Sequence, residues 1–119
     1  MKKLLVIGFL FLGGFAKGQV VPLDSVRSHE GTLTTICDKV WDTFVSKTGN
    51  IYLNYGGTFL NNSFTAVIFA KDTANFKEFK PQEFLKGKKV CVTGTVTIYK
   101  DKPQIVIKNP NQIRIPDQE

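Results

Sequence analysis

Alternating apolar and polar residues run through most of this chain. In the clearest stretch, residues 90–98, Val90, Val92, Val96 and Ile98 are separated by cysteine, threonine or glycine. Because successive side chains of a strand point to opposite faces, this period indicates a strand with one buried face. Alternation together with β-branched and aromatic residues predicts five strands, at residues 32–46, 51–55, 64–70, 90–98 and 104–108.

The first predicted strand loses its alternation between Trp41 and Phe44. A change of phase inside a strand is typical of a β-bulge, so we expect the strand to bend there. Trp41 is expected to be a packing residue, either in the core or over its end.

A helical segment is predicted between the third and fourth strands. Asp72 is expected to cap a helix over residues 73–79, and Pro81 is expected to open a further helical turn that ends at Gly87. Four apolar residues of this segment are expected to cover one end of the core: Phe76, Phe79, Phe84 and Leu85.

The first eighteen residues have the composition of a secretory signal peptide. Met1-Lys2-Lys3 is basic, residues 4–15 are apolar, and Ala16-Lys17-Gly18 places small residues at a cleavage position. A dozen apolar residues is too few to cross the ~30 Å hydrocarbon core of a bilayer. We therefore expect residues 1–18 to be removed and the protein to be exported, to the periplasm or the medium, without a stable membrane anchor.

The remaining residues are predicted to form one domain. They contain no repeat, no low-complexity run and no linker. Residues 19–31 are expected to be an N-terminal lead-in, residues 32–115 the domain itself, and residues 116–119 a polar tail.

Three strands, a helix and two strands is the element order of a five-stranded Greek-key barrel. The pieces I-C-D-K-V (36–40), G-N-I-Y-L-N-Y-G-G (49–57), F-T-A-V-I-F (64–69) and G-K-K-V-C-V-T-G-T-V-T-I-Y-K-D-K-P-Q-I (87–105) carry a more specific likeness. With them, residues 36–113 resemble small exported bacterial OB-fold proteins of the nucleic-acid-binding, single-strand-binding-like type. The resemblance implies an all-β OB barrel with one helix between strands 3 and 4. It identifies the ligand poorly, because OB barrels also bind sugars and proteins.

Charge is unevenly distributed along the chain. Three of the sixteen basic residues lie in the expected signal peptide, which leaves thirteen against ten acidic residues. Residues 77–108 hold eight basic and three acidic residues, so their excess of positive charge is a plausible footprint for a polyanion. A lysine-rich face that only keeps an exported protein soluble remains the alternative.

Cys37 and Cys91 are the two cysteines of the chain. If Ile36 and Val40 face the core, Cys37 points outward, and the same argument applies to Cys91 between Val90 and Val92. The two strands pair in an OB barrel, so the resemblance implies a cross-strand disulfide in an oxidising compartment. Two unpaired thiols are the alternative.

The resemblance places ligand contacts on the second and third strands and on the loops at their ends. Aromatic side chains would stack on bases and lysines would contact phosphates. The candidate nucleic-acid-binding residues are Lys47, Tyr52, Asn54, Phe59, Phe69, Tyr99, Lys100 and Lys102. Single-stranded DNA or RNA is thus the expected partner. The alternative is an exported module that binds a protein or a glycan, of the envelope-stress or inhibitor type, in which these aromatics pack and these lysines only solubilise the hairpin.

Catalytic, metal and cofactor sites are not expected. His29 is the single histidine, and nucleases with OB-like barrels need clustered carboxylates with arginines, whereas the mature chain holds only Arg27 and Arg114. Asp38 and Asp42 are four apart on one strand and would share a side, but a third ligand is missing. No P-loop or dinucleotide-binding fingerprint occurs.

Overall fold

The computed structural model describes residues 18–116. The predicted signal peptide therefore lies outside the described residues except for Gly18, and the predicted tail lies outside them except for Pro116.

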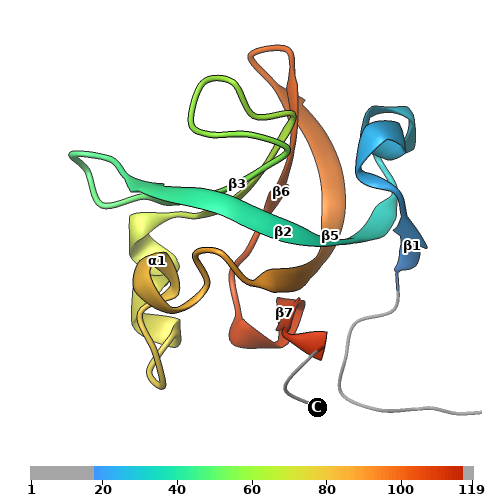
Figure 1. Ribbon diagram of the computed structural model, residues 1–119. Coiled ribbons are helices and arrows are strands. Elements are labelled where there is room, and N and C mark those ends of the chain that lie inside the picture. The colour runs from blue at the N-terminus through green and yellow to red at the C-terminus, as the bar shows by residue number, and fades with distance from the viewer. Residues whose placement is uncertain (1–17, 117–119) are drawn as a thin grey trace, which may run out of the picture.

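Five strands close into a barrel (Figure 1). Their spatial order is β2–β3–β4–β6–β5, and the pairing of β5 with β2 closes the ring. The β4–β6 pair is parallel and the other four pairs are antiparallel. The predicted all-β, OB-like barrel is confirmed. Its strands are β2 (Leu33–Val45), β3 (Ile51–Tyr55), β4 (Phe64–Ile68), β5 (Lys89–Tyr99) and β6 (Lys102–Val106).

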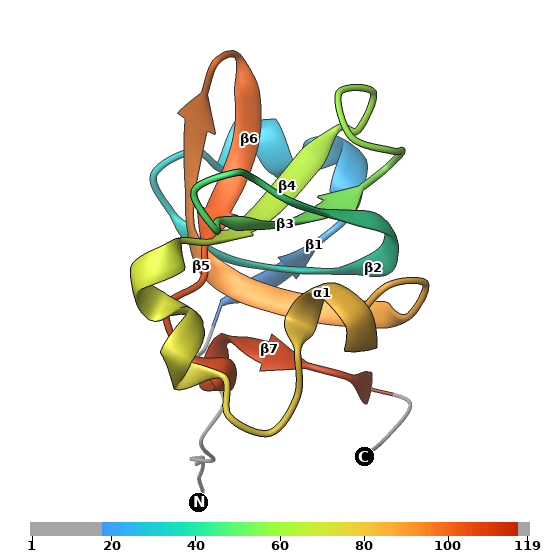
Figure 2. The same ribbon diagram turned by 90° about the vertical axis from the view of Figure 1, so that its left-hand side faces the viewer.

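The N-terminal lead-in packs against the barrel instead of extending away from it. Strand β1 (Gln19–Val21) pairs in parallel with β2, and the 3₁₀-helix η2 (Leu23–His29) follows. Val21 and Val26 are buried in the core. After η4 (Pro110–Gln112), strand β7 (Ile113–Arg114) pairs with β5, so β1 and β7 flank the β2–β5 pair (Figure 2).

Strand β2 changes partner at a bulge. Its first half pairs with β5 and its second half with β3, and the register shifts between Val40 and Asp42. This confirms the predicted bulge. The expectation for Trp41 is wrong: the bulge leaves its side chain 51% exposed, with Lys39 Nζ 4.7 Å from the ring centroid. The bulge also breaks the alternation that would have placed Asp38 and Asp42 on one side.

Helical segments cover one end of the barrel, as expected, but they are shorter and more irregular than predicted. The 3₁₀-helix η3 (Ala70–Asn75) follows Phe69 without a side-chain cap, so Asp72 lies inside its first turn and is not the N-cap. Helix α1 (Pro81–Phe84) then begins at the predicted proline. Of the four apolar residues expected to cover the core, Phe76 and Leu85 are buried, while Phe79 and Phe84 are partly buried against it.

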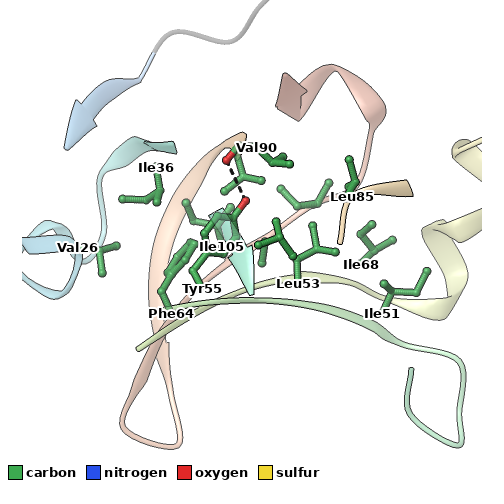
Figure 3. Close-up of a cluster of buried hydrophobic side chains, with 14 of the residues drawn as sticks. Val26, Ile36, Ile51, Leu53, Tyr55, Phe64, Ile68, Leu85, Val90 and Ile105 are labelled. Carbon is green, nitrogen blue, oxygen red and sulfur yellow. Dashed lines mark hydrogen bonds between the residues drawn. The ribbon is translucent and has the colours of Figure 1, made fainter. Parts of the chain in front are cut away.

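The barrel interior is filled by the inward residues of all five strands (Figure 3). Tyr55 is fully buried among them, and its hydroxyl donates a hydrogen bond to the Val90 carbonyl oxygen at 3.1 Å. Burial raises the pKa of the Tyr55 hydroxyl far above its ordinary value, and the nearby charge of Asp38 acts in the same direction. The hydroxyl therefore stays a neutral donor inside the barrel.

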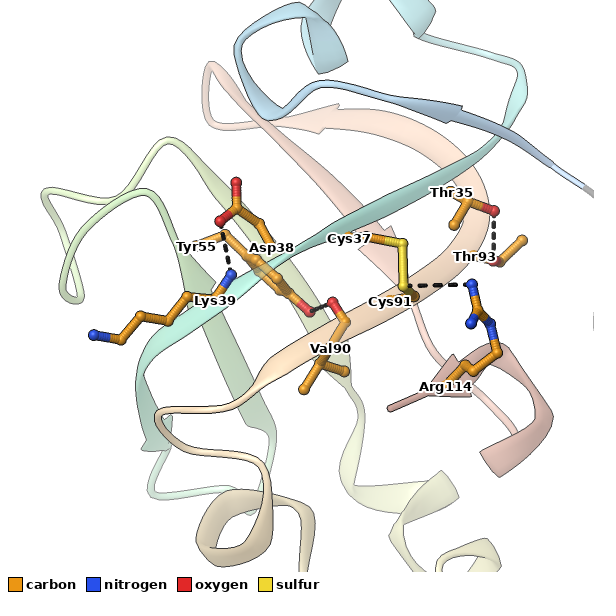
Figure 4. The surroundings of a disulfide bond; sticks show 9 residues. All are labelled: Thr35, Cys37, Asp38, Lys39, Tyr55, Val90, Cys91, Thr93 and Arg114. Atoms are coloured by element: carbon orange, nitrogen blue, oxygen red, sulfur yellow. Dashed lines mark hydrogen bonds between the residues drawn. A yellow bond between two sulfur atoms is a disulfide. The ribbon is translucent and has the colours of Figure 1, made fainter. Parts of the chain in front are cut away.

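The Cys37–Cys91 disulfide is present, as the resemblance implied (Figure 4). The two cysteines are directly opposite in the β2–β5 register, with Cα atoms 3.9 Å apart. The neighbouring pair on the same face, Thr35 and Thr93, joins its hydroxyls at 2.7 Å. Arg114 on β7 donates to Cys91 Sγ at 3.7 Å. This covalent cross-link therefore lies at the pairing that closes the barrel.

Gly94 permits β5 to curve closely around the core. A Cβ at this position would lie 2.5 Å from Cγ2 of Ile105, a branched side chain that cannot swing aside. We expect Gly94→Ala to lower the free energy of unfolding by about 1–3 kcal/mol through overpacking. Chemical denaturation measures this, with the exposed neighbour Thr95→Ala as control. Equal stability of the two variants would contradict the close approach.

Candidate functional site

A pocket of about 360 Å³ opens on the outer face of β2, β3 and β4, where the β3–β4 loop and the β5–β6 hairpin meet. Both connections project from the end of the barrel opposite η3 and α1 (Figures 1 and 2). The lining combines aromatic, amide, hydroxyl and cationic side chains, namely Phe44, Ser46, Tyr52, Phe59, Leu60, Asn62, Thr65, Tyr99, Lys100, Lys102 and Gln104.

Three aromatic rings form one wall of the pocket. Phe44 on β2 stacks on Phe59 of the β3–β4 loop, with ring centroids 4.2 Å apart. Tyr52 is directly opposite Phe44 in the β2–β3 register, and its ring lies 6.0 Å from Phe44 and 6.4 Å from Phe59. Phe44 and Phe59 each remain 39% exposed. A partly exposed ring stack of this kind offers a flat, apolar surface to a planar ligand.

The β5–β6 hairpin forms the cationic wall. Tyr99 pairs with Lys102, and the two residues between them, Lys100 and Asp101, have φ values of 51° and 66°. Two successive left-handed residues match the twist of a two-residue hairpin. Lys100 Nζ lies 5.4 Å from the Tyr99 ring centroid. Arg27 of η2 bonds both the carbonyl oxygen and the carboxylate of Asp101, which ties the hairpin tip to the N-terminal segment.

The loop that carries Phe59 also presents an exposed apolar residue. Leu60 is 75% exposed and has φ = 78°, a conformation that costs a branched residue free energy. Its position at the rim of the pocket gives a ligand an additional apolar contact.

The structure brings together five of the eight residues predicted for the site: Tyr52, Phe59, Tyr99, Lys100 and Lys102. The other three lie elsewhere. Asn54 is buried beneath the pocket, Lys47 is exposed in the β2–β3 turn, and Phe69 is half-buried just before η3.

Sequence reasoning missed several lining residues, and Phe44 is the most important. The β2 bulge reverses its parity, so Phe44 shares a face with Tyr52. The lost alternation at this point was the available signal. Asn62 and Gln104 carried no signal of their own, because only the fold brings the β3–β4 loop and β6 to the same pocket.

Asp42, one of the two carboxylates with four-residue spacing on β2, holds the β3–β4 loop in place. It accepts hydrogen bonds from the Asn54 side chain and from the backbone N–H of Phe59. Within residues 18–116, no group of three or more histidine, cysteine, aspartate or glutamate side chains is arranged to hold a metal ion. No helix in this part of the chain is long and apolar enough to cross a membrane.

Comparisons with known proteins leave the family open. No protein-family model matches the chain, and no curated protein matches it. One similar solved structure is titled "Crystal structure of a putative aspartyl-tRNA synthetase from Leishmania major Friedlin". It is 11% identical with a TM-score of 0.49, and the match covers 80% of this chain and 20% of that one. The chain thus spans about a fifth of that protein's length.

Proposed function

We propose that this protein binds single-stranded nucleic acid in the pocket, without catalysis and with little sequence preference. The observation that carries the proposal is the meeting of the Phe44–Phe59 ring stack with Lys100 and Lys102 around one opening. Aromatic rings accept any base, because every base has a flat face, and lysines contact the phosphates between bases.

The dimensions and exposure of the pocket support this proposal. Its volume is about 360 Å³, and its aromatic wall is partly exposed at one side of the opening while the basic hairpin borders the other. A base stacked on Phe59 or Tyr52 would lie in the pocket that Lys100 and Lys102 also line. The disulfide is compatible with an oxidising, exported location, where such a ligand would be extracellular nucleic acid.

A glycan is the second candidate, because aromatic rings also pack against sugars, and Ser46 and Gln104 in the lining offer hydrogen-bonding groups. The two ligands differ in charge. Nucleic-acid binding depends on lysine–phosphate contacts and weakens as salt is added. Binding of a neutral glycan does not need the lysines and does not weaken with salt.

The proposal is tested by removing the two hairpin charges. We expect Lys100→Met with Lys102→Met to weaken binding of a labelled mixed-sequence 15-mer by about tenfold at low salt, since two phosphate contacts are lost. Fluorescence anisotropy measures the affinity. Lys71→Met with Lys77→Met is the matched control, because both residues are exposed outside the pocket and the change in net charge is the same.

The control pair should change the affinity less than twofold, because it alters only the overall electrostatic attraction between the protein and the oligonucleotide. If both pairs weaken binding equally, attraction is diffuse and the pocket is not the site. If the wild-type protein binds no oligonucleotide at low salt, the proposed function is wrong.

A further inference from the structure

We propose that Asp42 and Asn62 are positioning residues that hold the two walls of the pocket in place before a ligand arrives. This inference rests on the proposed function of the pocket, since it assigns each residue to the wall that it supports. Both belong to a chain of side-chain hydrogen bonds that runs beneath the pocket from β2 to the basic hairpin.

The hydrogen-bond chain links five side chains without a gap. Asn54 Nδ2 donates to Asp42 Oδ1 at 2.8 Å, and Thr65 Oγ1 donates to Asn54 Oδ1 at 3.4 Å. Asn62 Nδ2 donates to Thr65 Oγ1 at 2.7 Å, and Lys102 Nζ donates to Asn62 Oδ1 at 3.0 Å. One end of the chain is therefore a carboxylate beside the aromatic wall, and the other end is an ammonium of the cationic wall.

The middle of the hydrogen-bond chain is buried, although it lies on the outer face of the strands. Asn54, Asn62 and Thr65 are 1%, 6% and 9% exposed. Burying amides and hydroxyls is unfavourable unless they are hydrogen-bonded, and these groups bond one another. Such a network fixes side-chain directions more tightly than apolar packing would, which suits a pocket that needs its walls at a set distance.

Asp42 supports the aromatic wall. Its second oxygen, Oδ2, accepts a hydrogen bond from the backbone N–H of Phe59 at 3.3 Å. That contact holds the loop where Phe59 stacks on Phe44. A carboxylate close to a polyanion site is electrostatically unfavourable, so its presence there calls for a compensating structural role.

Asn62 supports the cationic wall. Besides orienting Lys102, it donates to the Phe64 carbonyl oxygen at 2.8 Å, which fixes the amide at the start of β4. The Lys102 ammonium is thus directed by a rigid group, and less side-chain freedom is lost when it meets a phosphate.

Asp42→Asn separates positioning from simple charge because the two effects have opposite signs. Removing a carboxylate near the pocket would strengthen binding of the labelled 15-mer if charge alone mattered. Loss of the loop contact weakens it instead, and we expect about a fivefold loss, because an asparagine oxygen cannot accept both hydrogen bonds well. Asp38→Asn is the matched control: it removes the same charge from β2, but the Asp38 carboxylate accepts its hydrogen bond from the backbone N–H of Lys39 and not from the loop, so this change should not weaken binding.

A double-mutant cycle assigns the effect to the aromatic wall. In a Phe59→Ala background, Asp42→Asn should no longer weaken binding, because the ring that it positions is absent. For the other wall, Asn62→Ala should weaken binding about threefold in the wild-type background and not in a Lys102→Met background. Equal weakening in both backgrounds, or stronger binding by Asp42→Asn, would overturn the inference.

Amide hydrogen exchange in the free protein gives a readout that needs no ligand. Asp42→Asn should speed exchange of the Phe59 amide about fivefold. The Ile107 amide, which bonds the Val67 carbonyl oxygen in the barrel, should be unchanged and so shows that the fold is intact. An unchanged Phe59 amide would overturn the role of Asp42. This result is separate from the proposed function, whose failure would appear as an absence of binding by the wild-type protein.

Discussion

Loss of the Cys37–Cys91 disulfide is expected to lower the free energy of unfolding by about 4 kcal/mol. The bond joins residues 54 apart in sequence, and cross-linking a loop of that length removes much of the freedom of the unfolded chain. It also joins β2 to β5, the pairing that closes the barrel. We therefore expect the reduced protein to unfold at markedly lower denaturant concentration while keeping the same topology below that concentration.

The measurement compares urea unfolding with and without reductant, and repeats it for Cys37→Ala with Cys91→Ala. The double variant should match the reduced wild-type protein and should not respond to reductant. If reduction lowers the free energy of unfolding by less than about 1 kcal/mol, the disulfide does not stabilise the fold through the entropy of the unfolded chain.

Removal of the ring stack should have the largest effect on binding. Phe44→Ala with Phe59→Ala is expected to weaken binding of single-stranded oligonucleotides by about 10- to 100-fold, because aromatic stacking contributes about 1–3 kcal/mol per base. Both rings are partly exposed, so the fold should tolerate their loss.

Trp41→Ala is a sharp control for this pair of substitutions. Trp41 is a large aromatic residue on the same strand, half-exposed, and absent from the pocket lining. Its loss should leave affinity nearly unchanged. If Trp41→Ala weakens binding as much as the double variant does, the ligand lies on another face of β2 and the assignment of the pocket is wrong. Circular dichroism of all variants confirms that each remains folded.

The barrel could be predicted from the sequence because apolar residues alternate with other residues along its strands. Alternation in residues 90–98 and 51–55 located β5 and β3, and the parity of Cys37 and Cys91, read within the OB resemblance, led to the disulfide. These features depend on local period and on one known topology, both of which are visible in the printed sequence.

The predictions for individual side chains were wrong or incomplete where the local pattern of the sequence no longer decides the side-chain direction. The bulge in β2 places Trp41 in solvent and Phe44 in the pocket, and a phase change cannot be located to one residue from sequence. Asn54 faces outward as its parity predicted, yet Asp42 and Thr65 bind it from neighbouring strands and bury it. Such long-range contacts have no signature in a single sequence.

The site was predicted only in part, because some of its residues follow from local pattern and the others meet only through the fold. Tyr52 and the hairpin lysines follow from strand parity and a turn signal, and the structure places them at one opening. The hydrogen-bond chain from Asp42 to Lys102 could not be predicted, because its members come from β2, β3, the β3–β4 loop, β4 and β6 and meet only in the closed barrel. Export remains a prediction that the disulfide is compatible with.

The most direct test of the central claim is a salt titration of the wild-type protein with a labelled single-stranded 15-mer. With two lysine–phosphate contacts, the logarithm of the affinity should fall with the logarithm of salt concentration at a slope of about −1.4, or about 25-fold for a tenfold rise in salt. The slope should approach zero in the Lys100→Met, Lys102→Met variant. An affinity that does not change with salt, or no binding at low salt, would contradict the account.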